Sequence, residues 1–185
     1  MPQSLSPSPY NQEFFDAQSQ DSYISAQHVL ALFNRIFSPQ SVIDVGCGIG
    51  TWLKAWQEIN PHAFVFGVDG NQIASQHFYI DQSHYKMLDL TLPSQQLLSQ
   101  IPPLSESNKN LEKSKPYALC QSLEVAEHLE EKYAYNFVHL LTSLSNVVLF
   151  SAALPYQGGT HHVNEQLPQF WQHLFQEHHF HCFDF

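Results

Sequence analysis

The sequence predicts an α/β fold in which a mostly parallel sheet is covered by helices on both faces. Two observations indicate this fold. Short segments rich in β-branched residues alternate along the chain with segments whose apolar residues recur at helical spacing. A glycine-rich turn, DVGCGIG, joins the first of these strands to the helix that follows it. Strands that alternate with helices pair in parallel, because each crossover helix returns the chain to the same end of the sheet.

The first helix is expected from Asp21 to Ile36, because Pro39 ends the helical pattern. Residues 1–20 are expected to form a flexible arm or lid, whose apolar anchors are Tyr10, Phe14 and Phe15. Residues 21–185 then form a single domain. Its strands are predicted at 41–46, 63–69, 84–88, 117–124 and 146–154, with a strand-like end at 180–185. Its helices after the first are predicted at 51–59, 71–77, 91–101, 126–144 and 167–177. An insertion loop is predicted at 102–116.

Composition and charge narrow the class of protein. Seven Lys and Arg against seventeen Asp and Glu give a net charge of −10, which repels nucleic acid. The sequence has no apolar run long enough for a membrane span, and its start lacks the features of a secretory signal. The three cysteines show no CxxC spacing. We therefore expect a cytoplasmic protein that acts on a small molecule and touches neither nucleic acid nor membrane.

The glycine-rich turn predicts a ligand site. Gly46, Gly48 and Gly50 let the backbone bend and approach a ligand closely, and the N–H groups at the helix start attract an anionic group. A dinucleotide is disfavoured, because its fingerprint needs a third glycine where Thr51 stands. Asp69 follows the second strand, where a carboxylate can bind both hydroxyls of a ribose. Asp89 follows the third strand and serves either an adenine amino group or an ordinary helix cap.

These segments resemble the successive motifs of class I S-adenosylmethionine-dependent methyltransferases: SVIDVGCGIGTW, FGVDG, MLDL and YALCQSLEVAEHL. The resemblance implies a Rossmann-like sheet of strand order 3-2-1-4-5-7-6, from which the last strand is expected to be missing, with dimerisation as one way to cover the exposed edge. It also implies S-adenosyl-L-methionine as cofactor. The residues expected to contact it are Asp44, Gly46, Cys47, Gly48, Gly50, Asp69, Gly70, Asp89, Leu90, Ser122 and Leu123.

A second cluster is expected on the acceptor side. Glu124, Glu127 and His128 stand at i, i+3 and i+4 of a predicted helix and can share one face, and His162 follows the neighbouring fifth strand. This ExxEH…H pattern resembles the metal-dependent O-methyltransferases, both the small-RNA 2′-O-methylating type and some quinone-precursor enzymes, and implies that these four residues bind Mg²⁺, Mn²⁺, Fe²⁺ or Zn²⁺. The alternative is a methyltransferase without metal, in which Glu124 caps the helix and the histidine packs or faces solvent.

We therefore predict an S-adenosylmethionine-dependent methyltransferase that acts on a small molecule, at a hydroxyl oxygen. Glu127, His128 and His162 are the candidate catalytic residues, because an alcohol must lose its proton to a base or to a metal ion. Two alternatives belong to other classes. One is a cofactor-binding or interaction protein with a degenerate methyltransferase fold and no turnover. The other is a nicotinamide-binding reductase, against which Thr51 argues.

Overall fold

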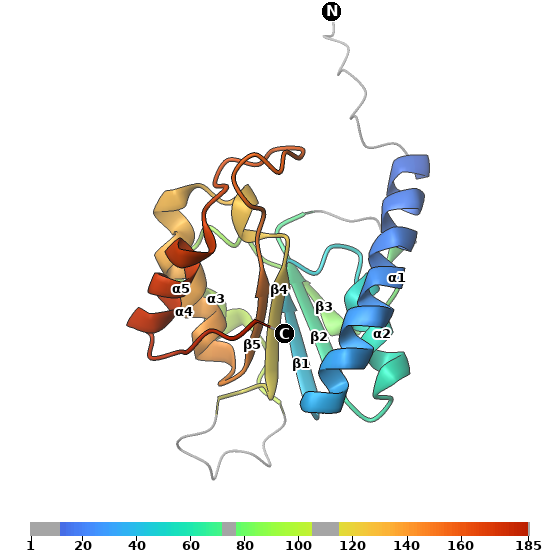
Figure 1. Ribbon diagram of the computed structural model, residues 1–185. Helices are drawn as coiled ribbons and strands as arrows, with labels where there is room; N and C mark the ends of the chain where they lie inside the picture. Colours follow the sequence, from blue (N-terminus) through green and yellow to red (C-terminus); the bar gives the residue numbers. More distant parts are fainter. Residues whose placement is uncertain (1–11, 72–76, 105–114, 185) are drawn as a thin grey trace, which may run out of the picture.

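A computed structural model of the chain describes residues 12–71, 77–104 and 115–184 (Figure 1). Most of the helix predicted at 71–77 and of the insertion loop predicted at 102–116 lies outside the described residues, as do Tyr10 and the side chains of Phe14 and Phe15. The lid predicted for the start of the chain therefore stays a prediction.

Five parallel strands form the sheet in the described part of the chain, in the order β3-β2-β1-β4-β5. This confirms the predicted parallel sheet and the order of its first five strands. Asp44 in β1 is paired with Gly67 in β2 on one side and with Gln121 in β4 on the other. The strands are β1 (Ser41–Val45), β2 (Phe64–Asp69), β3 (Tyr85–Met87), β4 (Leu119–Leu123) and β5 (Val148–Ser151).

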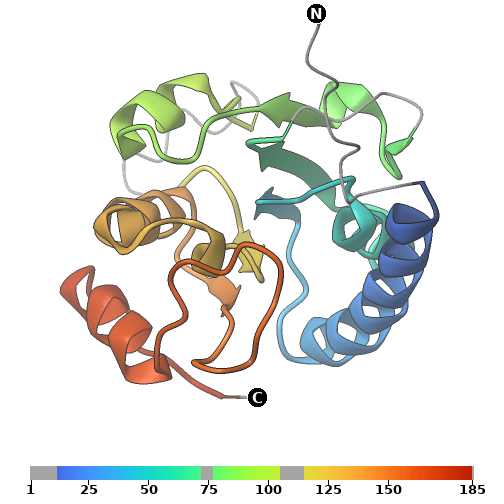
Figure 2. The same cartoon turned by 90° about the horizontal axis from the view of Figure 1, so that it is seen from above.

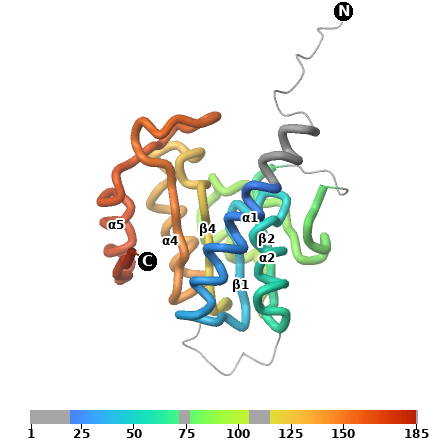
Figure 3. Tube along the Cα trace, turned by 45° about the vertical axis from the view of Figure 1, so that its right-hand side comes forward, coloured from blue at the N-terminus to red at the C-terminus, as the bar shows by residue number. Residues whose placement is uncertain are grey.

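Helices cover both faces of the sheet, as predicted. Helices α1 (Gln12–Ile36) and α2 (Thr51–Ile59) lie on one face, and α3 (Ser94–Gln100), α4 (Ala134–Leu144) and α5 (Pro168–Glu177) lie on the other (Figures 1 and 2). Helix α1 runs beside α2 (Figure 3) and is tied to its first turn, where the Trp52 indole donates to Ser22 Oγ over 3.1 Å. Short 3₁₀ turns complete the fold: η2 (Gln82–His84), η4 (Ala126–His128) and η5 (Glu131–Tyr133).

The central strands β1, β2 and β4 are buried on both faces, as expected for a parallel sheet between two helix layers, whereas the edge strands β3 and β5 are partly exposed. Alternate side chains of β1 enter different cores, because successive residues of a strand point to opposite faces. Val42 joins Trp56 and the α1 and α2 side chains, whereas Ile43 joins Phe137 and the α3, α4 and α5 side chains. The sheet is therefore held rigidly, and the loops at its carboxyl edge start from fixed positions.

Two predicted helix boundaries are wrong. Helix α1 begins at Gln12, not at Asp21, so the helix extends through residues 12–20. This stretch contains neither glycine nor proline, and its Gln, Glu and Ala residues favour a helix. The helix predicted from residue 126 begins as α4 only at Ala134, after the 3₁₀ turns η4 and η5.

The strand predicted at the end of the chain is also wrong: residues 180–184 form no strand. The chain reverses directly after α5, where His179 takes a left-handed conformation (φ 64°) and Phe180 N donates to Phe175 O over 3.0 Å. The Phe180 ring therefore packs back on α5, near Phe175 and beneath the ammonium group of Lys115. This return keeps the segment out of the hydrogen-bond ladder next to β5.

None of the described helices is long and apolar enough to cross a membrane. The cytoplasmic location and the homodimer stay predictions from the sequence.

Candidate functional site

The glycine-rich turn after β1 forms a tight loop at the carboxyl edge of the sheet. Gly46 N and Cys47 N both donate to Val68 O, over 2.7 and 3.1 Å, and so tie the loop to the end of β2. Gly46 (φ 87°) has no room for a side chain, because a Cβ there would stand 2.3 Å from Val125. Gly50 (φ 85°) has no room for a side chain either, because a Cβ there would stand 2.9 Å from the Ile80 side chain.

Gly48 differs from its neighbours in facing open space. Its φ of 52° is left-handed, but a Cβ built on it would meet no atom within 4 Å. Its N–H donates to Asp69 Oδ2 over 2.8 Å, so the predicted ribose-binding carboxylate is turned toward the loop. Asp69 Oδ1 accepts from Asn71 N, also over 2.8 Å. The loop and the carboxylate are thus in contact, with Gly48 facing open space and Asp69 itself only 6% exposed; binding of a nucleoside here stays a prediction.

Cys47 lies beneath this loop. Its thiol is buried against Gly67, where a Cβ would stand 2.5 Å from the sulfur, and burial raises the pKa of the thiol well above its ordinary value. The side chain therefore packs under the loop, and the cofactor contact predicted for Cys47 is left to its backbone. Gly67 is required in β2 because the loop folds back onto the sheet at this point.

Asp44 is buried below the loop, 3% exposed. Its Oδ2 accepts from Gln121 Nε2 over 2.8 Å, and Gln121 Oε1 accepts in turn from the Trp56 indole over 2.7 Å. The pKa of Asp44 is raised to about 7: burial is the largest cause, the bond from Gln121 opposes the rise, and nearby Asp69 adds to it. No basic side chain among the described residues contributes to this pKa, so Asp44 has no cationic partner among them.

Asp89 is exposed, and its Oδ1 accepts from Thr91 N over 2.9 Å and from Thr91 Oγ1 over 2.6 Å. These bonds lower the pKa of its carboxyl group. These bonds form a local turn with Thr91 and cap no helix, because α3 begins at Ser94 with Pro93 at its N-cap; the helix cap given as the alternative for Asp89 is therefore wrong. Contact of Asp89 with adenine stays a prediction.

The other predicted cofactor contacts lie in varied surroundings. Gly70 follows Asp69 and is exposed, whereas Leu90 is buried in the core on the α3 and α4 face. Ser122 is fully buried, and its hydroxyl donates to Val45 O over 2.7 Å, which joins β4 to β1. Leu123 packs, partly buried, on the core of the α1 and α2 face. Leu90, Ser122 and Leu123 therefore pack against or hydrogen-bond to other parts of the fold, and their contact with a cofactor stays a prediction, as does that of Gly70.

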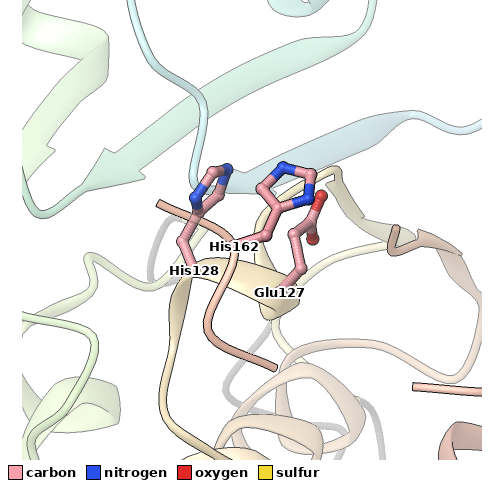
Figure 4. Close-up of side chains that lie close together, drawn as sticks. All are labelled: Glu127, His128 and His162. Carbon is pink, nitrogen blue, oxygen red and sulfur yellow. The ribbon is translucent and has the colours of Figure 1, made fainter. Parts of the chain in front are cut away.

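The acceptor-side residues meet as predicted, with one exception. Glu127, His128 and His162 each offer a ligand atom, and these atoms all lie within 4.8 Å of one another (Figure 4). The two imidazole rings stand edge to face, with centroids 5.0 Å apart. Glu127 is fully buried, and neither oxygen of its carboxylate has a hydrogen-bond partner among the described residues. Burial raises the pKa of this carboxyl group, and nearby Glu124 adds to the effect.

His162 reaches this position because the loop after β5 docks on η4. Val163 N and Asn164 N both donate to Glu127 O, over 2.9 and 3.0 Å. Glu165 then fixes the ring, since its Oε1 lies 3.0 Å from His162 Nδ1. The same carboxylate accepts from two backbone N–H groups of the loop, and its pKa is held below its ordinary value by these bonds. The Glu165 carboxylate therefore orients His162 Nδ1.

Glu124 does not join this group. It takes a left-handed conformation (φ 56°), and its Oε1 accepts from Ser151 Oγ over 2.7 Å. The expected sharing of one helix face fails because the chain forms no α-helix over 124–128; the 3₁₀ turn η4 begins only at Ala126. The four-residue ligand set predicted from the sequence is thus reduced to three.

Three residues of the site were not predicted from the sequence: Gln121, Trp56 and Asn164. Trp56 lies in the core of the α1 and α2 face, where its indole still needs an acceptor. Gln121 lies in the strand predicted at 117–124, and an amide in a buried strand signals a polar partner. Asn164 is 3% exposed and takes part in docking the His162 loop on η4.

Comparison with known proteins places the chain in a family. A family profile described as "Methyltransferase domain" matches residues 17–184. The chain therefore belongs to the methyltransferase domain family, which confirms the class I S-adenosylmethionine-dependent methyltransferase class indicated by its motifs. A search of curated protein sequences finds no match.

Solved structures share the fold at low sequence identity. A candidate O-methyltransferase from Nostoc punctiforme is 16% identical with a TM-score of 0.61, over 91% of this chain and 53% of that one. An O-methyltransferase family protein from Burkholderia thailandensis is 10% identical with a TM-score of 0.61, over 92% and 55%. The magnesium protoporphyrin IX methyltransferase of Synechocystis PCC 6803, solved with bound S-adenosylhomocysteine, is 17% identical with a TM-score of 0.59, over 95% and 80%. The chain thus spans about half the length of the first two.

Proposed function

We propose that the chain binds S-adenosylmethionine and transfers its methyl group to a hydroxyl oxygen of a small molecule. One observation carries the acceptor side of this proposal: the buried Glu127 carboxylate has no hydrogen-bond partner within residues 12–71, 77–104 and 115–184, and it lies beside two imidazoles. A buried carboxylate without a partner is costly to the fold, and such a group in a native site calls for a ligand. The solved relatives named O-methyltransferases are consistent with an oxygen acceptor.

The residues around the glycine-rich loop suit this cofactor. The open side of Gly48 admits a ligand close to the backbone, and Asp69 stands beside it with two oxygens that can accept from ribose hydroxyls. Asp44 and Asp69 place negative charge below the loop, which favours a ligand with an ammonium group and a sulfonium. The same charge repels the pyrophosphate of a dinucleotide. When bound, the cofactor supplies a methyl group already activated on a positively charged sulfur.

The chain's own task is to take up the proton of the acceptor hydroxyl. His162 Nδ1 faces Glu165, so Nε2, which lies against Gly159, is left as the nitrogen that can accept a proton. Glu165 holds the ring in this orientation and stabilises its charged form, as the third member of a base–orienter arrangement does. Glu127, whose pKa is raised, is a second proton acceptor in the same cluster. His128, exposed beside His162, lies where the acceptor can reach both rings.

A divalent metal ion is a second candidate for the same cluster, and the 4.8 Å spacing of the three ligand atoms favours it. Two imidazoles and one carboxylate suit Zn²⁺, Fe²⁺ or Mn²⁺ better than Mg²⁺, which prefers oxygen ligands. Glu165 would then be the outer partner that orients a ligand histidine. A metal ion would lower the pKa of the acceptor hydroxyl and neutralise Glu127.

Two experiments test cofactor binding and methyl transfer separately. Thermal denaturation is measured with S-adenosylmethionine, S-adenosylhomocysteine and NADH, and only the first two are expected to stabilise the chain. Transfer of a labelled methyl group is then measured on a panel of hydroxylated small molecules. Binding without transfer to any of them would contradict the enzyme and favour a binding protein without turnover.

Substitutions test the catalytic role proposed for the cluster of Glu127, His128 and His162. Glu127→Gln and His162→Gln are expected to lower kcat at least 100-fold with little change in cofactor affinity, because neither residue lies at the glycine-rich loop. His173→Gln is the matched control, since His173 is exposed on α5. Loss of activity with a chelator, restored by one of Zn²⁺, Fe²⁺ or Mn²⁺, would select the metal; activity unaffected by the chelator would select the histidine base.

A further inference from the structure

A chain of two buried hydrogen bonds crosses from α2 to the floor of the glycine-rich loop. The Trp56 indole donates to Gln121 Oε1 over 2.7 Å, and Gln121 Nε2 donates to Asp44 Oδ2 over 2.8 Å. Trp56 and Gln121 are both 0% exposed, whereas Asp44 at the end of the chain is 3% exposed. Gln121 has no surface of its own, so any effect on a ligand must pass through Asp44.

The indole decides which way the Gln121 amide points. An indole N–H can only donate, so the amide oxygen must face Trp56 and the NH₂ group must face Asp44. A group that only donates toward Asp44 requires an acceptor there, and an ionised carboxylate is the best acceptor available. The Trp56–Gln121 pair therefore favours the deprotonated form of Asp44 and fixes the position of one of its oxygens.

The remaining surroundings of Asp44 act in the opposite direction. Burial and, to a smaller extent, the charge of Asp69 on β2 raise its pKa, which is about 7 with the opposing bond from Gln121 included. The thiols of Cys47 and Cys120 are the other titratable groups coupled to it, and both are neutral because burial raises their pKa values well above the ordinary one. Asp44 thus stands near the midpoint of its titration at neutral pH, and its bond from Gln121 is the interaction that favours its charge.

We propose that Gln121 is a positioning residue that keeps the Asp44 carboxylate charged and aimed at a cationic group, the ammonium end of the cofactor's amino-acid part. This inference rests on the proposed cofactor. An ion pair with that ammonium would complete the ionisation of Asp44. Trp56 acts one step further back, by holding the amide of Gln121 in the only orientation that donates to Asp44.

The test is the pH dependence of S-adenosylhomocysteine affinity, measured by calorimetry between pH 5.5 and 8. In the wild type, affinity is expected to rise with pH and level off near the pKa of Asp44, about 7. Gln121→Met fills the same space without a donor. It should move this midpoint to higher pH and weaken binding about tenfold at pH 7, the usual effect of losing a hydrogen bond to a charged group. Trp56→Phe should move it in the same direction by less.

Three controls separate positioning from packing. Leu119→Val alters a buried side chain on the same strand and face and should leave the midpoint unchanged. Asp44→Asn should abolish the pH dependence, and Gln121→Met added to it should change the affinity less than about twofold, because coupled residues are not additive. The double variant thereby shows whether Gln121 acts through Asp44.

Each remaining outcome decides a different claim. If Gln121→Met and Trp56→Phe weaken binding equally at every pH with an unchanged midpoint, or if Gln121→Met adds fully to Asp44→Asn, the positioning role is overturned and the proposed cofactor stands. If wild-type protein, folded by circular dichroism, binds no S-adenosylhomocysteine at any pH, the proposed function itself is overturned.

Discussion

The Asp69 carboxylate accepts a hydrogen bond from the backbone N–H of Gly48 over 2.8 Å, across the junction of β2 with the glycine-rich loop. The two groups proposed to contact the cofactor are therefore already in contact with each other. A second bond, from Asn71 N to the other carboxylate oxygen, fixes the orientation of Asp69. Each oxygen still has acceptor capacity left, because an ionised carboxylate accepts about four hydrogen bonds.

Replacing Asp69 by Asn should separate ligand binding from stability. The Asn oxygen can still accept from Gly48 N, so we expect Tm to fall by no more than a few degrees, in line with a loss of about 1 kcal/mol. Cofactor affinity should fall at least tenfold, since an amide offers one acceptor oxygen to two ribose hydroxyls. Calorimetry with S-adenosylhomocysteine and thermal denaturation measure the two effects. Unchanged affinity would remove Asp69 from the binding site.

The glycines of the loop should differ in what they do. Gly46→Ala places a methyl group against Val125 in a left-handed conformation and should destabilise the fold by about 2–4 kcal/mol. Gly48→Ala meets no atom and should cost only the conformational strain, about 1 kcal/mol.

Cofactor affinity should nevertheless fall sharply in Gly48→Ala, because the added methyl occupies the open side of the loop. Urea unfolding and ligand titration of both variants check this. A Gly48→Ala protein that binds the cofactor as well as the wild type would show that the ligand does not approach Gly48.

Local patterns predicted the parts of the site that neighbouring residues determine. The strand, the glycine-rich turn and Asp69 all follow from residue types close in sequence. The Gln121–Asp44 bond joins residues 77 positions apart and depends on the register between β4 and β1, which the sequence does not specify. For the same reason the partner of Trp56 was not foreseen.

The errors arose where one backbone conformation was assumed to continue. Glu124 was placed on a helix face with Glu127, but it is left-handed and bonded to Ser151 across the ends of β4 and β5. The apolar end of the chain was expected as a strand, but the reversal at His179 packs Phe180 on α5. In both cases a left-handed residue that is not glycine changed the chain direction, and such residues have no clear sequence signal.

His178 should make the contact between α4 and α5 sensitive to acid. Its ring packs near those of Tyr135 and His139, and its pKa is lowered by burial and then by His139. Of the other charged groups facing it, Glu177 raises this pKa, and His179 and Lys115 lower it.

The folded chain therefore binds fewer protons at His178 than the unfolded chain does between its lowered pKa and the ordinary 6.5. Stability contributed by the neutral ring is present above 6.5 and is lost as the pH falls through this window. His178→Phe keeps the ring and should lose less stability than the wild type between pH 7.5 and 5, by up to about 1 kcal/mol. Equal pH slopes in urea unfolding would contradict this.

Glu127→Gln should show that the buried Glu127 carboxylate lowers the free energy of unfolding at neutral pH. The pKa of this buried carboxyl is raised above its ordinary 4.5, so the folded chain binds more protons than the unfolded chain between the two values. The wild type must therefore lose stability as the pH rises through that window, and the loss persists at neutral pH. The Gln variant carries no charge and should be more stable by about 1–3 kcal/mol at pH 7.5, an advantage that disappears below pH 4.5.

Urea unfolding from pH 4 to 8 measures the difference. A Gln variant less stable than the wild type at pH 7.5 would mean that the carboxylate has a stabilising partner, such as a retained metal ion, which metal analysis of the purified protein would reveal.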